Sequence, residues 1–186
     1  MTRRESQAGF SLLETLIALM LVGVSMTGLL VAFAASGQFG VLSRRQATAL
    51  AIARSVSGQL ARVAYNDARL ANNNTLNDAN IGDPNGLFAH PTLPTGNDAP
   101  DSTLPTQTIG NETYEVYVNV ALQMGDGNWD PTTLEIGRIY AVIVRYRVSG
   151  SSGNQSGNDA HFMRAVTLGY HYNPAAVGTG ALPLPL

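Results

Sequence analysis

The chain has 186 residues, which is enough for one domain with its own core and an appended segment, but too few for two large domains. Its formal net charge is −2, so the composition does not indicate a basic surface that would bind nucleic acid. All eleven basic residues are Arg. No Cys is present, which excludes disulfides, thiol catalysis and cysteine-ligated metal centres. Apolar residues concentrate in residues 10–39, whereas residues 66–112 are mostly polar or turn-forming.

An apolar stretch follows a short polar N-terminal segment. Between Leu16 and Ala35 the only polar side chains are those of Ser25 and Thr27. Twenty helical residues rise about 30 Å, which matches the hydrocarbon core of a bilayer. The apolar part of a secretory signal peptide is shorter, about 7–15 residues. The sequence therefore predicts a helix that spans a lipid bilayer.

Three kinds of segment share this apolar pattern. A cleaved secretory signal could be cut in the small-residue run at 34–37, and a twin-arginine signal could use Arg3 and Arg4. A plain signal anchor is the third. None of the three explains Glu14, a carboxylate inside the apolar stretch. A charged side chain at the centre of a membrane helix costs about 2.5–3.5 kcal/mol, and less near its end. Glu14 therefore either snorkels to the interface or has a partner.

The residues around Glu14 form a known pattern. A short basic leader ends in Gly9, Phe10 follows, and Glu14 is the fifth residue after that junction, before about twenty apolar residues. This arrangement, Gly9-Phe10-Ser11-Leu12-Leu13-Glu14, closely resembles the class III leader of type IV prepilins and pseudopilins. In detail the resemblance covers residues 1–60.

The resemblance implies a processing pathway and a set of partners. Prepilin peptidase would cut between Gly9 and Phe10 on the cytoplasmic side and N-methylate Phe10. The helix would cross the bacterial inner membrane once, with its N-terminus cytoplasmic, and the rest would lie in the periplasm and then in the pilus fibre. Glu14 would meet the N-terminus of a neighbouring pilin subunit, and the inner-membrane assembly platform would be a further partner.

The pattern turns amphipathic beyond Phe39. The apolar residues that recur at helical spacing are Leu50, Ala53, Val56, Leu60 and Val63, and they predict one helix from about residue 10 to about residue 69. We therefore expect a leader at 1–9, a transmembrane and assembly helix at 10–38, and a periplasmic domain at 39–186. No proline interrupts the membrane half, a feature that resembles minor rather than major pilins and pseudopilins.

The rest of the chain divides into a polar loop and three strands. Residues 70–112 are rich in Asn, Asp, Pro and Gly, which predicts a long loop that cannot form a core alone. Residues 114–124, 139–148 and 162–172 carry strand patterns with turn-rich linkers, and so predict a three-strand antiparallel meander. The amphipathic half of the helix would cover one face, giving a pilin-like α+β fold with an irregular tail from Asn173.

Candidate sites for chemistry are few. Asp126, Asn128 and Asp130 could offer oxygen ligands to calcium, but no Glu stands at the last ligand position, and a hairpin loop explains them equally. His161 and His171 share a strand face without a third ligand. Arg145 and Arg147 could touch phosphate, although exposed arginines are usually solvated. No motif indicates an enzyme, and we expect no cofactor other than this calcium candidate.

The sequence therefore favours a minor pilin of a type IV pilus, most similar to PilV-like minor pilins, that acts in priming, assembly or at the tip. A minor pseudopilin of a type II secretion system shares the leader, helix and sheet. A single-span anchor that presents a small binding domain is the third hypothesis. Removal of the leader by prepilin peptidase would exclude the third.

Overall fold

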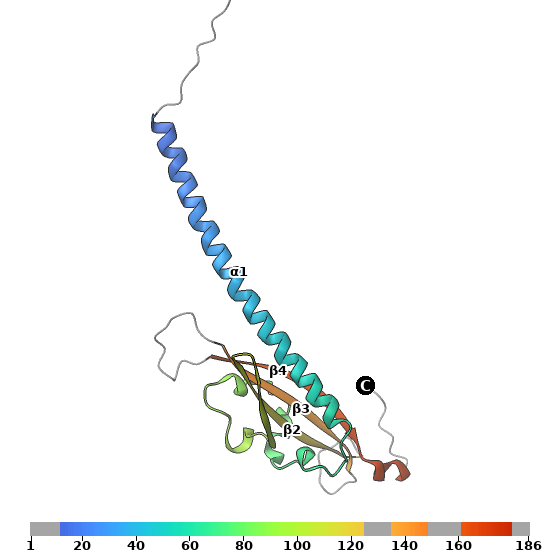
Figure 1. Ribbon diagram of the computed structural model, residues 1–186. Helices are drawn as coiled ribbons and strands as arrows, with labels where there is room; N and C mark the ends of the chain where they lie inside the picture. The colour runs from blue at the N-terminus through green and yellow to red at the C-terminus, as the bar shows by residue number, and fades with distance from the viewer. Residues whose placement is uncertain (1–11, 125–134, 149–160, 180–186) are drawn as a thin grey trace, which may run out of the picture. The chain divides into compact units, whose positions relative to one another are not determined.

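A computed structural model of the protein describes residues 12–124, 135–148 and 161–179 (Figure 1). Its contacts divide the chain into two compact units, residues 1–43 and 44–186. Helix α1 (Leu12–Leu60) belongs to both, because its first part lies in the first unit and residues 44–60 lie in the second. The second unit holds every strand.

The sheet has four antiparallel strands in the order β1-β2-β3-β4 (Figure 1). They are β1 (Ser102–Ile109), β2 (Glu112–Met124), β3 (Glu135–Val148) and β4 (His161–Tyr172). Strands β2, β3 and β4 correspond to the three predicted ones. Together with the long helix, they confirm the pilin-like α+β fold. The prediction of only three strands is wrong, because β1 lies inside the range 70–112 that was assigned to a loop.

The composition of β1 explains why the sequence did not indicate it. Most of its side chains are exposed, so no alternation of apolar and polar residues marks a buried face. It also contains Pro105, and its pairing with β2 shifts register between Leu104 and Gln107. Proline and a bulge are typical of an edge strand. Pairing with β2 therefore forms this strand, and its own sequence pattern does not predict it.

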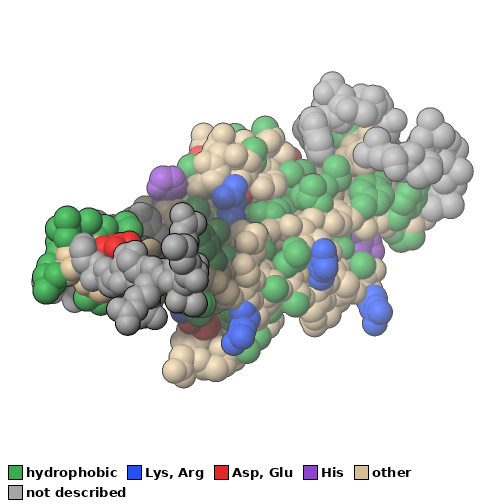
Figure 2. Space-filling model, turned by 90° about the horizontal axis from the view of Figure 1, so that it is seen from above, with side chains coloured by type: hydrophobic (Ala, Val, Ile, Leu, Met, Phe, Trp, Pro, Cys, Tyr) green, Lys and Arg blue, Asp and Glu red, His purple; other side chains and the backbone are tan. Residues whose placement is uncertain are grey.

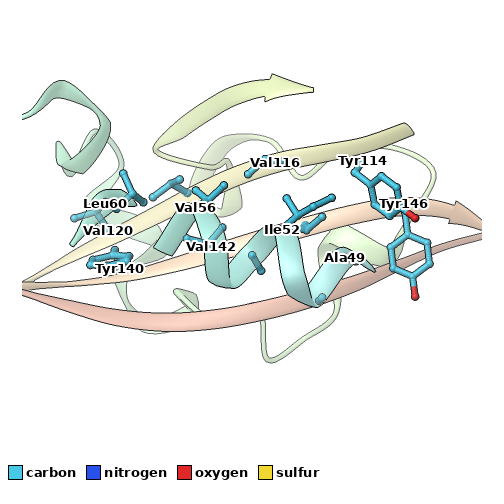
Figure 3. Packing of buried hydrophobic residues seen from close by; sticks show 14 of the residues in the cluster. Ala49, Ile52, Val56, Leu60, Tyr114, Val116, Val120, Tyr140, Val142 and Tyr146 are labelled. Atoms are coloured by element: carbon cyan, nitrogen blue, oxygen red, sulfur yellow. The ribbon is translucent and has the colours of Figure 1, made fainter. Parts of the chain in front are cut away.

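The main core lies between residues 49–60 of α1 and one face of the sheet (Figure 3). The even-numbered residues of β2 and β3 point to this face, as the period of two predicts. Ala53, Val56 and Leu60 are buried as expected, while Leu50 and Val63 are partly buried. The remaining buried members from the helix and the two central strands are Ala49, Ile52, Tyr114, Val116, Val118, Val120, Tyr140, Val142, Val144 and Tyr146.

Helix α1 ends at Leu60 rather than near Arg69. The chain then tightens, with Arg62 N–H bonded to the Gln59 carbonyl and Val63 N–H to the Leu60 carbonyl, each three residues back. Beyond this turn, backbone carbonyls are contacted by side chains from strands of the sheet. The Val63 carbonyl contacts His171, and Arg138 donates to the carbonyls of residues 65 and 70. These tertiary contacts replace the helical bonds that the sequence pattern alone would have continued.

The segment predicted as a loop at 70–112 is ordered around short 3₁₀ helices. They are η1 (Ala68–Leu70), η2 (Thr75–Asn80), η3 (Leu87–Ala89) and η4 (Gly96–Asp98). Phe88 packs with Tyr117 and Ile143, and Val166 lies against them. Because these sheet residues point away from α1, the segment covers the second face of the sheet. The tail also begins with a short helix, η6 (Pro174–Thr179).

Candidate functional site

Glu14 lies in the first described turn of α1, and its residue is exposed. The four residues that follow are the apolar or weakly polar start of the span, with Thr15 donating to the Leu12 carbonyl at 2.9 Å. Glu14 is therefore presented on the helix surface close to where the described helix begins.

The two hydroxyls inside the apolar stretch are satisfied within the helix. Ser25 Oγ donates to the Leu21 carbonyl at 2.8 Å, and Thr27 Oγ1 donates to the Gly23 carbonyl at 2.9 Å. Backbone carbonyls four residues back are the usual partners of Ser and Thr in helices. Both hydroxyls can therefore enter hydrocarbon without an unpaired donor.

No residue in the first part of α1 is buried. Every residue from Leu12 to Ala34 is exposed, and Figure 2 shows hydrophobic side chains gathered on this helix. By length and composition it is the one helix in the described residues that could cross a membrane. A helix that is apolar on all sides must bury its surface in lipid or against other helices. The chain is thus suited to anchoring in a membrane.

Several predicted site residues lie outside the described residues. Gly9 and Phe10, the predicted cleavage and methylation site, belong to residues 1–11. The calcium candidates Asp126, Asn128 and Asp130 belong to residues 125–134. Calcium binding there stays a prediction. Among the residues that the structure does describe, no group of three or more His, Asp or Glu side chains could hold a metal ion.

His171 and Arg145 have structural partners, whereas Arg147 is exposed as expected and the side chain of His161 lies outside the described part of the chain. His171 Nε2 lies 2.9 Å from the Val63 carbonyl, and its ring meets Tyr65 edge-on at 5.6 Å. Arg145 was expected on a solvated face, and that expectation is wrong: the residue is 2% exposed. Its Nη2 donates to the Pro91 carbonyl at 2.8 Å, and its guanidinium lies 3.7 Å from the centre of the Phe162 ring. Arg145 therefore ties the 71–100 segment to the sheet.

Sequence reasoning missed Asp101, the residue that joins this segment to β2. Its Oδ1 accepts from the backbone N–H groups of Asn73 and Asn74, each at 2.6 Å, and its Oδ2 accepts from Val120 N–H at 2.8 Å. Asn77 adds a longer side-chain bond. The only signal in the sequence was an Asp directly before a strand, which is too common to indicate such a role.

A second network joins the segment to β4. Asp83 is buried, adopts a positive φ of 53° and accepts from the N–H groups of Leu87 and Phe88. Arg164 Nε lies 2.5 Å from Asp83 Oδ2, and Arg164 Nη2 donates to the Asp83 carbonyl. The polar residues that predicted a loop therefore hold the segment in place. Their side chains accept hydrogen bonds from backbone N–H groups that would otherwise have no partner.

One open pocket of about 520 Å³ lies beside η2 and the end of β2. It contains Asp78, whose two carboxylate oxygens both accept from Asn72 Nδ2, at 3.0 and 3.1 Å. Burial, with the negative charge of Asp101 nearby, raises the pKa of Asp78 to about 6 although the Asn72 bond opposes the shift. Among the described residues that line it, Asp78 is the only ionisable one, and the others are Asn72, Thr75, Leu76, Ala79, Leu122 and Met124.

A family model matches the N-terminal part of the chain. The family model described as the prokaryotic N-terminal methylation motif matches residues 4–30, which include the predicted processing junction, Glu14 and most of the apolar span. No curated protein and no solved structure matches the chain.

The matched motif fits the geometry of the described part of the chain. It runs into the exposed apolar helix α1, whose last turns cover an antiparallel sheet. Proteins with this class III leader are processed by prepilin peptidase, interact with other pilins, and are structural rather than enzymatic. The motif at residues 4–30 and the α+β arrangement are similar to those of type IV pilin-like proteins.

Proposed function

We propose that the chain is a minor pilin of a type IV pilus, which crosses the bacterial inner membrane with its N-terminus cytoplasmic and then enters the fibre at its tip or during priming. The observation that carries the proposal is the methylation motif at 4–30, which leads into a helix exposed on all sides. The absence of proline from the described helix favours a minor subunit. A fibre core of packed apolar helices would bury the surface that the isolated chain exposes.

Glu14 has a defined role in this proposal. After cleavage, the N-methylated amine of Phe10 carries a positive charge, and the carboxylate of Glu14 in an adjacent subunit would pair with it. A charge pair inside an apolar helix bundle is stronger than one in water, because the local dielectric constant is low. The pair would set the axial register of each incoming helix.

The test compares Glu14→Ala with the parent in its own host. We expect Glu14→Ala to be cleaved and inserted normally, so that Edman sequencing of both mature proteins begins at Phe10. The amount in sheared fibres should fall at least about tenfold if a partly desolvated pair is lost. Ser25→Ala, which removes a polar group bonded within the helix, is the matched control and should enter fibres normally.

Equal recovery of Glu14→Ala and parent in fibres would remove the assembly role of Glu14. An intact leader would remove the processing step and restore the plain anchor hypothesis. A deletion strain separates the two kinds of system: loss of piliation and twitching with normal exoprotein secretion supports the minor pilin, whereas the converse identifies a minor pseudopilin of a type II secretion system.

A further inference from the structure

Arginine is the only charged residue type over a long stretch of α1 and the turn after it. From residue 15 to residue 66 the sequence has no Asp or Glu, and its charged residues are Arg44, Arg45, Arg54 and Arg62. Arg45 pairs with the Glu112 carboxylate at the start of β2. Arg44 is exposed and has no carboxylate partner among the described residues. Positive charge is therefore unbalanced where the second unit begins.

Arg44 lies at the end of the second unit where β2 begins and β3 ends, because its neighbour in sequence contacts the start of β2. Tyr114 of β2 pairs with Tyr146 of β3, and Figure 3 shows both at the same end of the sheet as Ala49 of α1. Arg147 follows, is exposed, and likewise has no carboxylate partner in the described part of the chain. Strand residues alternate in direction, so this arginine lies on the face opposite α1. We call Arg44, Arg45 and Arg147 the basic end.

The basic end follows the apolar part of α1 without a linker. Leu42 is the last apolar residue of that run, and Arg44 stands two positions later in the same helix. A helix from Leu16 to Leu42 rises about 40 Å, and a bilayer with its headgroup regions is about 40–45 Å thick. When this run enters a bilayer, covalent connection alone brings Arg44 to the level of the lipid phosphates, however the rest of the second unit is turned.

Guanidinium groups suit lipid phosphates. Arg presents a planar fork of N–H donors that binds phosphate oxygens at two points. An arginine close to an anionic membrane surface strengthens binding about fivefold, and the effect decays over about 8 Å at physiological salt. Ile109, which is 50% exposed in the β1–β2 hairpin opposite Glu112, adds an apolar contact at this end.

We propose that the basic end docks on the phosphate groups of anionic phospholipids, in the leaflet from which α1 emerges. This inference rests on the membrane anchoring that is part of the proposed function. Docking holds the second unit against the membrane until the subunit is taken into the fibre. Uptake into the fibre must then break these contacts.

Spin-labelled lipids test the proposal with the full-length chain in lipid nanodiscs. Electron paramagnetic resonance measures how strongly the protein restricts labelled phosphatidylglycerol, which is anionic, relative to labelled phosphatidylcholine, which has no net charge. We expect a preference for phosphatidylglycerol of at least about fivefold in about 0.05 M NaCl, falling below about twofold in about 0.5 M NaCl. A ratio near one at low salt, or a preference that salt does not reduce, overturns the inference.

Two double variants with equal changes in charge locate this preference. Arg44→Gln with Arg147→Gln removes both unpaired guanidinium groups of the basic end. Arg54→Gln with Arg62→Gln is the matched control, because both residues are exposed and Arg54 already lies about 15 Å further along the helix than Arg44. We expect the first variant to lower the preference at least about threefold and the control to leave it unchanged. Equal effects overturn the inference. If either variant melts at a lower temperature than the parent, the salt series on the parent decides.

A fluorescent label measures which end of the second unit meets the membrane. The chain has no Cys, so a label can be attached at Asn111→Cys, beside Glu112, or at Asn66→Cys, beyond the other end of α1, and both positions are exposed. In discs with phosphatidylglycerol, a quencher on the lipid headgroup should quench the label at 111 more than the label at 66. The difference should shrink in discs of phosphatidylcholine alone. Equal quenching at both positions, or a difference that phosphatidylglycerol does not increase, overturns the inference.

The two proposals fail differently. A chain that spans the disc and reaches sheared fibres, but shows no preference for phosphatidylglycerol, leaves the minor pilin standing and overturns the docking. A chain that does not span the disc loses the membrane anchoring, and both proposals fall with it.

Discussion

Asp101 shows how one residue fixes the position of a long polar segment. Its two carboxylate oxygens accept three backbone N–H bonds, from Asn73, from Asn74 and from Val120 of β2. Bonds to an ionised acceptor are the strong ones in proteins. A buried N–H that loses its partner keeps its full desolvation cost, so loss of this carboxylate should be costly for the position of the segment.

Asp101→Ala should lower the free energy of unfolding by about 3 kcal/mol, because three N–H groups lose a charged acceptor. Asp98→Ala is the matched control, since Asp98 accepts a single side-chain bond from Asn80 at 3.3 Å. Its cost should stay below about 1 kcal/mol. Urea denaturation of both variants measures the difference, and equal costs would contradict the role of Asp101.

Asp78 makes stability depend on pH. Its pKa in the folded protein is about 6, above the ordinary value of 3.8. The folded state therefore binds more protons than the unfolded chain between these values, so the contribution is present at low pH and lost as pH rises through about 6. Asp78→Asn should be more stable than the parent at pH 7.5 and equal to it near pH 3.5.

Thermal melts of parent and Asp78→Asn across that range measure the difference. Asp67→Asn is the control, because the Arg69 guanidinium and backbone N–H lower the pKa of Asp67. Its shift has the opposite sign, so this variant should gain nothing at pH 7.5. A parallel pair of curves for parent and Asp78→Asn would show that Asp78 titrates normally.

At the scale of elements, a close contact joins α1, β3 and β4. The Tyr140 hydroxyl donates to the Ser57 carbonyl of α1 at 3.0 Å, and its ring lies over Gly169 of β4. A Cβ added at Gly169 would lie 2.2 Å from the Tyr140 ring. The absence of a side chain at 169 is therefore what allows the tyrosine to reach the helix.

Gly169→Ala should lower the free energy of unfolding by about 2–3 kcal/mol, because the Tyr140 ring must move and lose its bond to α1. Gly58→Ala is the matched control: an added Cβ there meets nothing within 4 Å. It should raise stability by about 0.5–1 kcal/mol through helix propensity. Opposite signs in denaturant unfolding support the contact, and a stable Gly169→Ala would contradict it.

At the scale of the whole molecule, the two units differ in how much of their apolar surface is buried. Residues 44–186 contain both hydrophobic clusters, including residues 49–60 of α1, whereas the described part of residues 1–43 has no buried residue. The second unit therefore has a core of its own, whereas the described residues of the first are nearly all exposed and mostly apolar.

A chain cut to residues 44–186 should remain soluble without detergent and unfold cooperatively, because its core residues are all retained. Val118→Asp in the same chain should abolish the transition, since Val118 is fully buried and a lone charge there has no partner. Circular dichroism melts measure both. A truncated chain without a cooperative transition would show that the first unit is needed for folding.

Local patterns by themselves indicated the apolar helix that could cross a membrane, the methylation motif, the core face of the helix and strands β2 to β4. Each is written in residues adjacent in sequence: an uninterrupted apolar run, a short motif, or a period of about 3.6 or 2. The matched motif is of this kind, because it is a short run of adjacent residues at 4–30. Its recognition therefore needed no tertiary information.

Tertiary structure alone decided four features. They are the strand β1, the end of α1 at Leu60, the packing of the 71–100 segment on the face of the sheet opposite α1, and the burial of Arg145. Each depends on a partner far away in sequence. Asp101 binds Val120, Arg145 binds the Pro91 carbonyl, and Arg138 binds the Leu70 carbonyl. Polar residues leave no periodic trace, because their energy comes from particular donors and acceptors rather than from a buried face, and only the folded chain brings those together.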